Sequence, residues 1–111
     1  MADQAHHQKI AALNDAFRRT FAGGRVMLTA GIDALPALRK PEIMMAVQAF
    51  NKFNTDNDPY HEHDFGTFEL HGRKIFWKID YYDKTMEAGS EDPADPEKTT
   101  RVLTIMLAEE Y

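Results

Sequence analysis

The sequence contains no cysteine, and this absence excludes disulfide bonds, thiolate metal ligands and cysteine nucleophiles together. It also lacks an apolar run approaching the ~20 residues of a membrane-spanning helix. Its N-terminus is polar and has none of the hydrophobic segment that a signal peptide requires. We therefore expect a cytoplasmic protein without a membrane segment.

Basic residues are also few: 13 lysines and arginines stand against 18 aspartates and glutamates, for a formal net charge of -5. A general nucleic-acid-binding protein usually carries a basic face, so direct nucleic-acid binding is not expected. Otherwise the composition is that of a globular protein, with 43% hydrophobic and 28% charged residues. A chain of 111 residues is enough for one modest core, and we expect a single domain over residues 1–111.

The stretch His61–Asp83 is rich in aromatic and histidine residues and predicts a β-hairpin. Phe65–Leu70 and Lys74–Tyr82 hold the aromatic and β-branched residues that strands favour. His71-Gly72 stands between them as a two-residue turn, because histidine tolerates the left-handed conformation and glycine adopts it freely. The hairpin is therefore the centre of the predicted sheet.

The turn sets a register in which Glu69 faces Lys74, Gly66 faces Trp77 and, further along, His63 faces Asp80. Because side chains alternate across a strand, one face of the hairpin becomes a core face, on which Gly66 leaves space for the Trp77 indole. That core face carries Phe68, Leu70, Ile75, Trp77, Ile79 and Tyr81.

Residues 4–22 have the apolar spacing of an amphipathic helix, with Asp3 as its N-cap. Arg18 and Arg19 fall in the last turn, where cations suit the helix dipole, and we expect both to be solvated rather than to bind phosphate. The buried stripe is predicted to be Ile10, Leu13, Phe17 and Phe21.

Four further segments complete the predicted order. Arg25–Thr29 reads as a short strand inside the sheet, and Ile32–Arg39 as a short helical turn. Pro41 suits the first position of a second helix, about 41–53. Thr99–Glu109 is apolar and β-branched, which favours a central strand, with a terminal helix as the alternative. The prediction is an α+β fold: two helices packed on a mostly antiparallel sheet of about four strands with a central β-hairpin.

The loop before the hairpin has features of two metal sites. Asn54, Asp56 and Asp58 have the spacing of a calcium loop, but Pro59 replaces the required glycine and Phe65 the required glutamate. A loop of turn-forming side chains is the preferred interpretation.

His61 and His63 could point the same way on a strand and share a zinc ion, with Glu62 or Asp64 nearby. A further ligand at suitable spacing is missing. We therefore expect neither a metal nor another cofactor.

A polar cluster on the second face of the hairpin is the candidate catalytic group: His61, His63, Lys78, Asp80 and Tyr82. A His63–Asp80 pair across two strands could support general acid–base chemistry, and Lys78 could position an anion. The alternative is a cross-strand ion pair on a half-exposed sheet, with Lys78 lying over aromatic rings.

Acidic residues gather in residues 54–64 and 80–97, where Lys84 is the opposing cation between Asp80 and Glu97. Clustered charge of this kind steers association with a basic partner, although a solvated loop has the same composition. The candidate binding residues are Asp83, Glu91, Asp92 and Asp95.

Three blocks of the chain are specific in combination: ALNDAFRRTF-GGRVMLTAGI, DNDPYHEHDFGTFELHGRKIFWKIDYYD and GSEDPADPEKTTRVLTIMLAEEY. Together they resemble a family of small uncharacterised bacterial proteins, a domain of unknown function, often encoded on plasmids and mobile elements of alphaproteobacteria. The resemblance covers about residues 9–111 and supplies no activity and no catalytic residues. It implies a cytoplasmic accessory protein, for example one that modulates host defence.

Two functions remain open from the sequence. The preferred one is a non-enzymatic protein that binds a basic protein partner through its acidic segments. The alternative is a small hydrolase-type enzyme that uses the hairpin cluster. Neither the partner nor the oligomeric state follows from the sequence.

Overall fold

A computed structural model describes residues 4–111 and confirms the α+β fold. The helices are α1 (Gln4–Thr20), α2 (Ala30–Asp33) and α3 (Arg39–Ala49), followed at the end of the chain by the 3-10 turn η1 (Ala108–Glu110). The strands are β1 (Arg25–Leu28), β2 (Phe65–Leu70), β3 (Arg73–Tyr82) and β4 (Thr100–Leu107). The predicted N-cap Asp3 lies outside the described residues.

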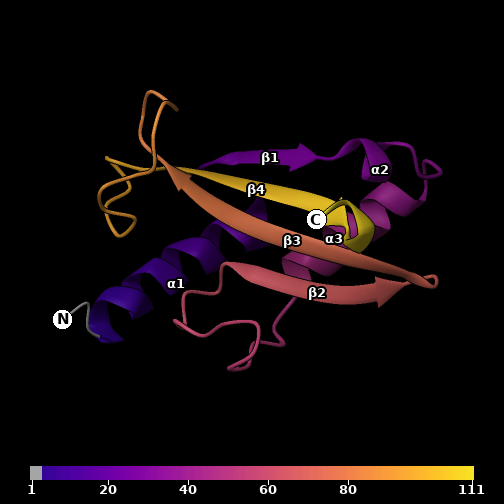
Figure 1. The fold of residues 1–111 in the computed structure, drawn as a ribbon, viewed down its shortest axis with the longest axis horizontal. Coiled ribbons are helices and arrows are strands. Elements are labelled where there is room, and N and C mark those ends of the chain that lie inside the picture. The colour runs from indigo at the N-terminus through magenta and orange to yellow at the C-terminus, as the bar shows by residue number, and fades with distance from the viewer. Residues whose placement is uncertain (1–3) are drawn as a thin grey trace.

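The four strands form one sheet in the order β1-β4-β3-β2. β3 pairs antiparallel with both β2 and β4, whereas β1 pairs parallel with β4. Figure 1 shows the sheet in front, with α1 and α3 behind it. The other face of the sheet is open except where the C-terminus folds back, so that the Tyr111 ring lies 5.4 Å from that of Phe76.

The hairpin has the predicted register from Phe65↔Lys78 to Leu70↔Arg73, including Gly66↔Trp77. His71 and Gly72 both have positive φ, at 51° and 79°, as a two-residue turn between twisted strands requires. A Cβ at Gly66 would overlap the Trp77 indole, so the indole occupies the space that Gly66 was predicted to leave.

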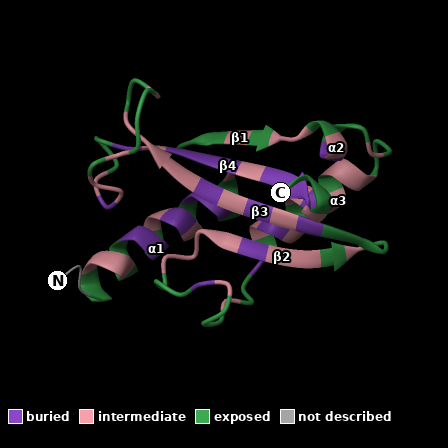
Figure 2. Cartoon of the chain, viewed as in Figure 1, coloured by how far each residue is buried: buried purple, intermediate pink, exposed green. Residues whose placement is uncertain are grey.

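The core lies between the sheet and the two long helices, and Figure 2 shows the buried residues along β3, β4 and the inner side of α1. Trp77 is at its centre, fully buried and edge-on to Phe50. β4 is a central strand with buried residues on both faces, which excludes the helical alternative for this segment. The core cluster consists of Phe17, Ile32, Ile43, Val47, Phe50, Ile75, Trp77, Ile79, Leu103, Ile105 and Leu107.

Several predicted boundaries and positions were wrong. β1 is an edge strand rather than an internal one, since it pairs only with β4 and alternate residues are exposed. α1 ends at Thr20, because Phe21 takes a left-handed φ of 59°. The second long helix begins at Arg39, before Pro41, and ends at Ala49.

Candidate functional site

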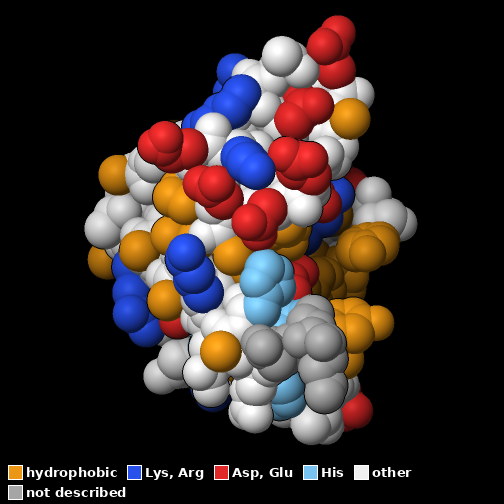
Figure 3. Space-filling view, turned by 90° about the vertical axis from the view of Figure 1, so that its left-hand side faces the viewer, with side chains coloured by type: hydrophobic (Ala, Val, Ile, Leu, Met, Phe, Trp, Pro, Cys, Tyr) orange, Lys and Arg blue, Asp and Glu red, His pale blue; other side chains and the backbone are white. Residues whose placement is uncertain are grey.

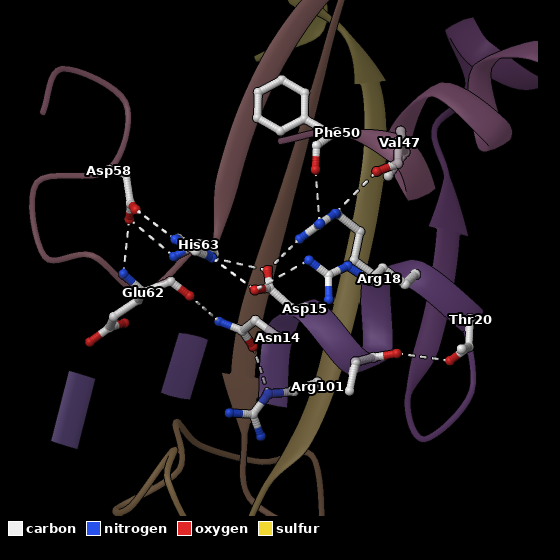
Figure 4. Close-up of polar contacts among 12 residues, drawn as sticks. Asn14, Asp15, Arg18, Thr20, Val47, Phe50, Asp58, Glu62, His63 and Arg101 are labelled. Carbon is white, nitrogen blue, oxygen red and sulfur yellow. Dashed lines mark hydrogen bonds and ion pairs between the residues drawn. The ribbon is translucent and has the colours of Figure 1, made fainter. Parts of the chain in front are cut away.

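Arg18 is the centre of a polar cluster between α1, α3 and the segment before the hairpin (Figure 4). Its side chain is 1% exposed, so the prediction of a solvated arginine was wrong. The guanidinium donates to the Val47 carbonyl at 3.1 Å and the Phe50 carbonyl at 2.9 Å, at the C-terminal end of α3. The Val47 carbonyl also accepts from the Phe50 N–H at 3.2 Å, and Arg18 adds a charged donor at this end of the helix. A cation also suits the negative end of the helix dipole. Arg18 therefore caps α3 from a different helix.

His63 adjoins the same cluster through Asp15, which also accepts a hydrogen bond from Arg18 at 2.9 Å. The Nδ1 atom of His63 lies 3.0 Å from the Asp15 carboxylate, and Nε2 lies 3.6 Å from Asp58 Oδ2. The imidazole stacks on the Phe53 ring with centroids 4.0 Å apart. With carboxylates at both ring nitrogens, His63 holds the segment before the hairpin against α1.

A second network is centred on the buried Asn14, one turn before Arg18 on α1. The Asn14 side-chain amide donates to the Glu62 carbonyl at 2.9 Å and to the Tyr81 hydroxyl at 2.8 Å. The Arg101 Nε atom donates to Asn14 Oδ1 at 2.7 Å, and its guanidinium lies 5.2 Å from the centre of the Tyr81 ring. The Tyr81 hydroxyl donates in turn to Glu62 Oε1 at 3.1 Å, and burial raises the pKa of Tyr81. Each of these buried polar groups therefore has a hydrogen-bond partner, and the network continues to His7 through Glu62 and to the Pro93 carbonyl through Arg101.

Asp64 has the most unusual ionisation of the described carboxylates. Burial raises the pKa of its carboxyl to about 6, and the nearby negative charges of Glu62, Asp58 and Asp80 add to the effect. Its backbone carbonyl accepts a hydrogen bond from Ile79 at 2.8 Å, which continues the hairpin ladder by one residue beyond β2. A carboxyl with a pKa of about 6 is typical of functional sites, but the charged groups that act on Asp64 are themselves carboxylates.

The predicted catalytic cluster is not assembled. His63 lies on the helix-covered side, whereas Lys78, Asp80 and Tyr82 alternate with the core residues of β3 and lie on the open face. The predicted His63–Asp80 pair was therefore wrong: the strand begins at Phe65, because the left-handed φ of 57° at His63 turns the chain away from β3.

Lys78 instead pairs with Asp80 at 2.8 Å, and this hydrogen bond raises the pKa of the lysine. His61 is exposed and lines a hollow of about 200 Å³ with Phe53 and Asp58.

The loop before the hairpin holds its own backbone together. Asn54 Oδ1 accepts from the backbone N–H groups of Asp56 and Asn57, and Asp58 Oδ1 accepts from those of Glu62 and His63. These contacts use an oxygen of Asn54 and one of Asp58, two of the three residues in the calcium hypothesis. Across residues 4–111, no three histidines, aspartates or glutamates are grouped as a metal site needs.

The candidate binding residues lie in the irregular segment 83–99, which is ordered by its acidic side chains. Asp83 Oδ1 accepts from the Thr85 hydroxyl and the Glu87 backbone, and the Glu87 bond is the main cause that lowers the pKa of Asp83. Asp92 and Asp95 each accept a backbone N–H two residues further on, at 3.1 and 2.9 Å. The segment is therefore a series of side-chain-closed turns.

Other contacts fix this segment to the sheet. The Thr99 hydroxyl donates to the Asp92 carbonyl at 2.8 Å, Arg101 donates to the Pro93 carbonyl, and Ala94 is 4% exposed. Figure 3 shows the result: acidic side chains gather at this end of the molecule, with a few basic side chains among them. The exposed acids of the segment are Glu87, Glu91 and Glu97.

The residues of the two buried networks were not identified from the sequence. Asn14 and Arg18 lie four residues apart beside the apolar positions Ile10 and Phe17, and this spacing places them on the buried side of α1. A polar residue within an apolar stripe is the signal that could have identified them. Their partners come from segments far apart in the sequence, such as Arg101.

Comparisons with known proteins give a family but no activity. A family model described as "Protein of unknown function (DUF3768)" matches residues 28–110. No curated protein and no solved structure matches the chain. In residues 4–111 no helix has both the length and the apolar character needed to cross a membrane.

Proposed function

We propose that this chain, which belongs to this family of proteins of unknown function, is a non-enzymatic protein that binds a basic surface of a partner protein through its acidic end. The acidic end is defined by Asp83, Glu87, Glu91, Asp92, Asp95 and Glu97. An accessory role on bacterial mobile elements, with modulation of host defence, extends the proposal on the strength of the resemblance described above.

The proposal rests on the observation that the acidic end has an ordered backbone. Its aspartates close turns, while the carboxylates of Glu87 and Glu97 remain exposed, and Glu91 is paired only at 3.4 Å with Lys98. A surface that is already ordered loses less conformational entropy on binding than a free loop does. Its charge would steer a basic partner and fix its orientation.

The test is a pull-down from bacterial lysate with the immobilised chain at low and moderate salt. Wild type should retain a basic protein at low salt and lose it as salt screens the exposed charges, over ~8 Å at physiological ionic strength. The triple variant Glu87→Gln, Glu91→Gln, Glu97→Gln should lose that protein while unfolding like wild type, because exposed charges contribute little stability.

A matched control removes the same amount of charge elsewhere, with Asp33→Asn, Glu69→Gln and Glu109→Gln. It should retain the partner. Equal losses from both triple variants would show that only net charge matters, and an unchanged pull-down with the first variant would remove the acidic end as the binding surface. Lys78→Gln on the open face should also leave the pull-down unchanged; its loss would move the function to the sheet.

A further inference from the structure

β2 is an edge strand, and half of its backbone groups face away from the sheet. A two-residue turn at His71–Gly72 closes with a hydrogen-bonded pair, Leu70 with Arg73, and hydrogen-bonded pairs then alternate along the hairpin. The bond from Ile79 to the Asp64 carbonyl, at 2.8 Å, agrees with this alternation. The N–H and C=O groups of the odd-numbered residues Phe65, Thr67 and Glu69 therefore point outward, and within residues 4–111 they have no partner.

This edge carries few of the features that protect edge strands from pairing. β2 contains no proline and no lysine, its register with β3 is free of bulges, and Glu69 is its one charged residue. The opposite edge, β1, is only four residues long and begins with Arg25. At the start of β2 the edge is closed, because the His63 N–H donates to Asp58 Oδ1 at 3.0 Å. The open stretch is thus Phe65–Leu70.

A groove of about 470 Å³ runs between this edge and the C-terminal half of α3. Ala46 and Ala49 form its helix side, and such small side chains leave room for those of an added strand. Phe50 and Phe68 give it an apolar lining. A strand added to β2 would therefore find both backbone partners and a place for its helix-side side chains.

We propose that this edge is a homodimer interface, in which β2 of a second copy pairs antiparallel with β2 across a twofold axis at Thr67. Phe65 then faces Glu69 of the second copy, and Thr67 faces Thr67. Each of these pairs exchanges two hydrogen bonds, so every outward N–H and C=O from Phe65 to Glu69 is satisfied. The two sheets become one continuous sheet.

The side chains of β2 are also compatible with those of β2 from a second copy. In this register Phe68 of the second copy faces Gly66 of the first. Its ring then enters the groove, which Phe50 and Phe68 of the first copy line. No like charges face each other, since Glu69 faces a phenylalanine across the new contact and keeps Lys74 on its own β3. A register centred on Phe68 would leave the outward groups of Phe65 without a strand partner. The contact is short, so we expect a dimer that dissociates on dilution.

Sedimentation velocity over a range of protein concentrations tests the proposal. Wild type should shift from monomer to dimer as concentration rises. Thr67→Pro removes the central outward N–H and should remain monomeric throughout; proline is tolerated there because that N–H does not bond to β3. Thr67→Val keeps the N–H and nearly the same shape, and should dimerise like wild type.

Amide hydrogen exchange on the wild-type chain gives a second readout that needs no variant. The amides of Phe65, Thr67 and Glu69 should exchange several-fold more slowly at high than at low protein concentration. A chain that stays monomeric at all concentrations, or a Thr67→Pro variant that is folded and dimerises like wild type, would overturn the proposal. Protection of these amides by an added lysate peptide in a monomeric chain would assign the edge to a peptide and also overturn it.

The proposal is independent of the function proposed above. The triple variant of the acidic end should dimerise like wild type, and Thr67→Pro should retain the basic partner. Each proposal can thus fail without the other.

Discussion

Arg18 shows how a single buried charge can join two helices. Replacing it with methionine keeps most of its length but removes the guanidinium donors from Asp15 and from the carbonyls of Val47 and Phe50. We expect Arg18→Met to lower the free energy of unfolding by about 3–5 kcal/mol, as for other buried pairs that lose one partner. The neighbour Arg19 is a matched control with a side chain 63% exposed, and Arg19→Met should change stability by less than about 0.5 kcal/mol. Urea denaturation measures both, and similar values for the two variants would contradict the capping role.

Asp64 gives a prediction of pH dependence at the same scale. Its pKa of about 6 in the folded chain lies above the usual 3.8, so the folded state binds more protons between these values. The stabilisation that comes from the protonated Asp64 carboxyl is fully present below pH 3.8 and is lost as the pH rises through about 6. Asp64→Asn should therefore stabilise the protein at pH ~8 by about 1–2 kcal/mol, allowing for partial exposure, and by little at pH ~4.

The measurement is urea denaturation of both proteins at the two pH values. Asp56→Asn, at an exposed position of the preceding loop, is the control and should show no such pH dependence. A stabilisation by Asp64→Asn that is the same at both pH values would show that ionisation of Asp64 is not its cause.

At the scale of the element, the hairpin depends on the match between a glycine and a tryptophan. A Cβ at Gly66 would overlap the Trp77 indole and approach the Phe50 ring to 2.8 Å. Gly66→Ala should lower the free energy of unfolding by about 1–3 kcal/mol, and by less in a Trp77→Phe background, where the smaller ring leaves room. Gly89→Ala is the control, since its nearest neighbour, the Tyr81 carbonyl, would be 3.8 Å away. Thermal or urea unfolding of the two single variants and the double variant measures this coupling. Additive effects would mean that Gly66 and Trp77 do not share this space.

At the scale of the whole molecule, α1 is part of the core although the family model begins at residue 28. It supplies the buried residues Phe17, Asn14 and Arg18. A chain of residues 24–111 would expose one side of the Trp77 cluster and lose the cap of α3. We expect it not to unfold cooperatively, as judged by circular dichroism during urea denaturation. A chain of residues 4–111, which keeps all of α1, is the control, and cooperative unfolding of the shorter chain at a similar midpoint would contradict this dependence.

Local patterns in the sequence determined much of the fold. The turn residues His71-Gly72 and the alternation from Phe65 to Tyr82 were sufficient to predict the hairpin, its register and the burial of Trp77. The apolar segment near the C-terminus predicted a central strand, which is β4. These predictions held because turn geometry and the two-residue period of a strand are local properties of the chain.

The tertiary structure alone decided which polar residues meet. His63 was assigned to Asp80 by extending the hairpin register, but a left-handed backbone directs it to Asp15, 48 residues away in sequence. From the sequence, Arg18 was predicted to be a solvated residue at the end of a helix. In the folded chain, the carbonyls at the end of α3 lie beside it and accept its hydrogen bonds. Buried polar groups are satisfied by whichever partners the packing brings near, and packing joins segments that no local pattern connects. The edge position of β1 has the same origin, since strand order depends on the path of the whole chain.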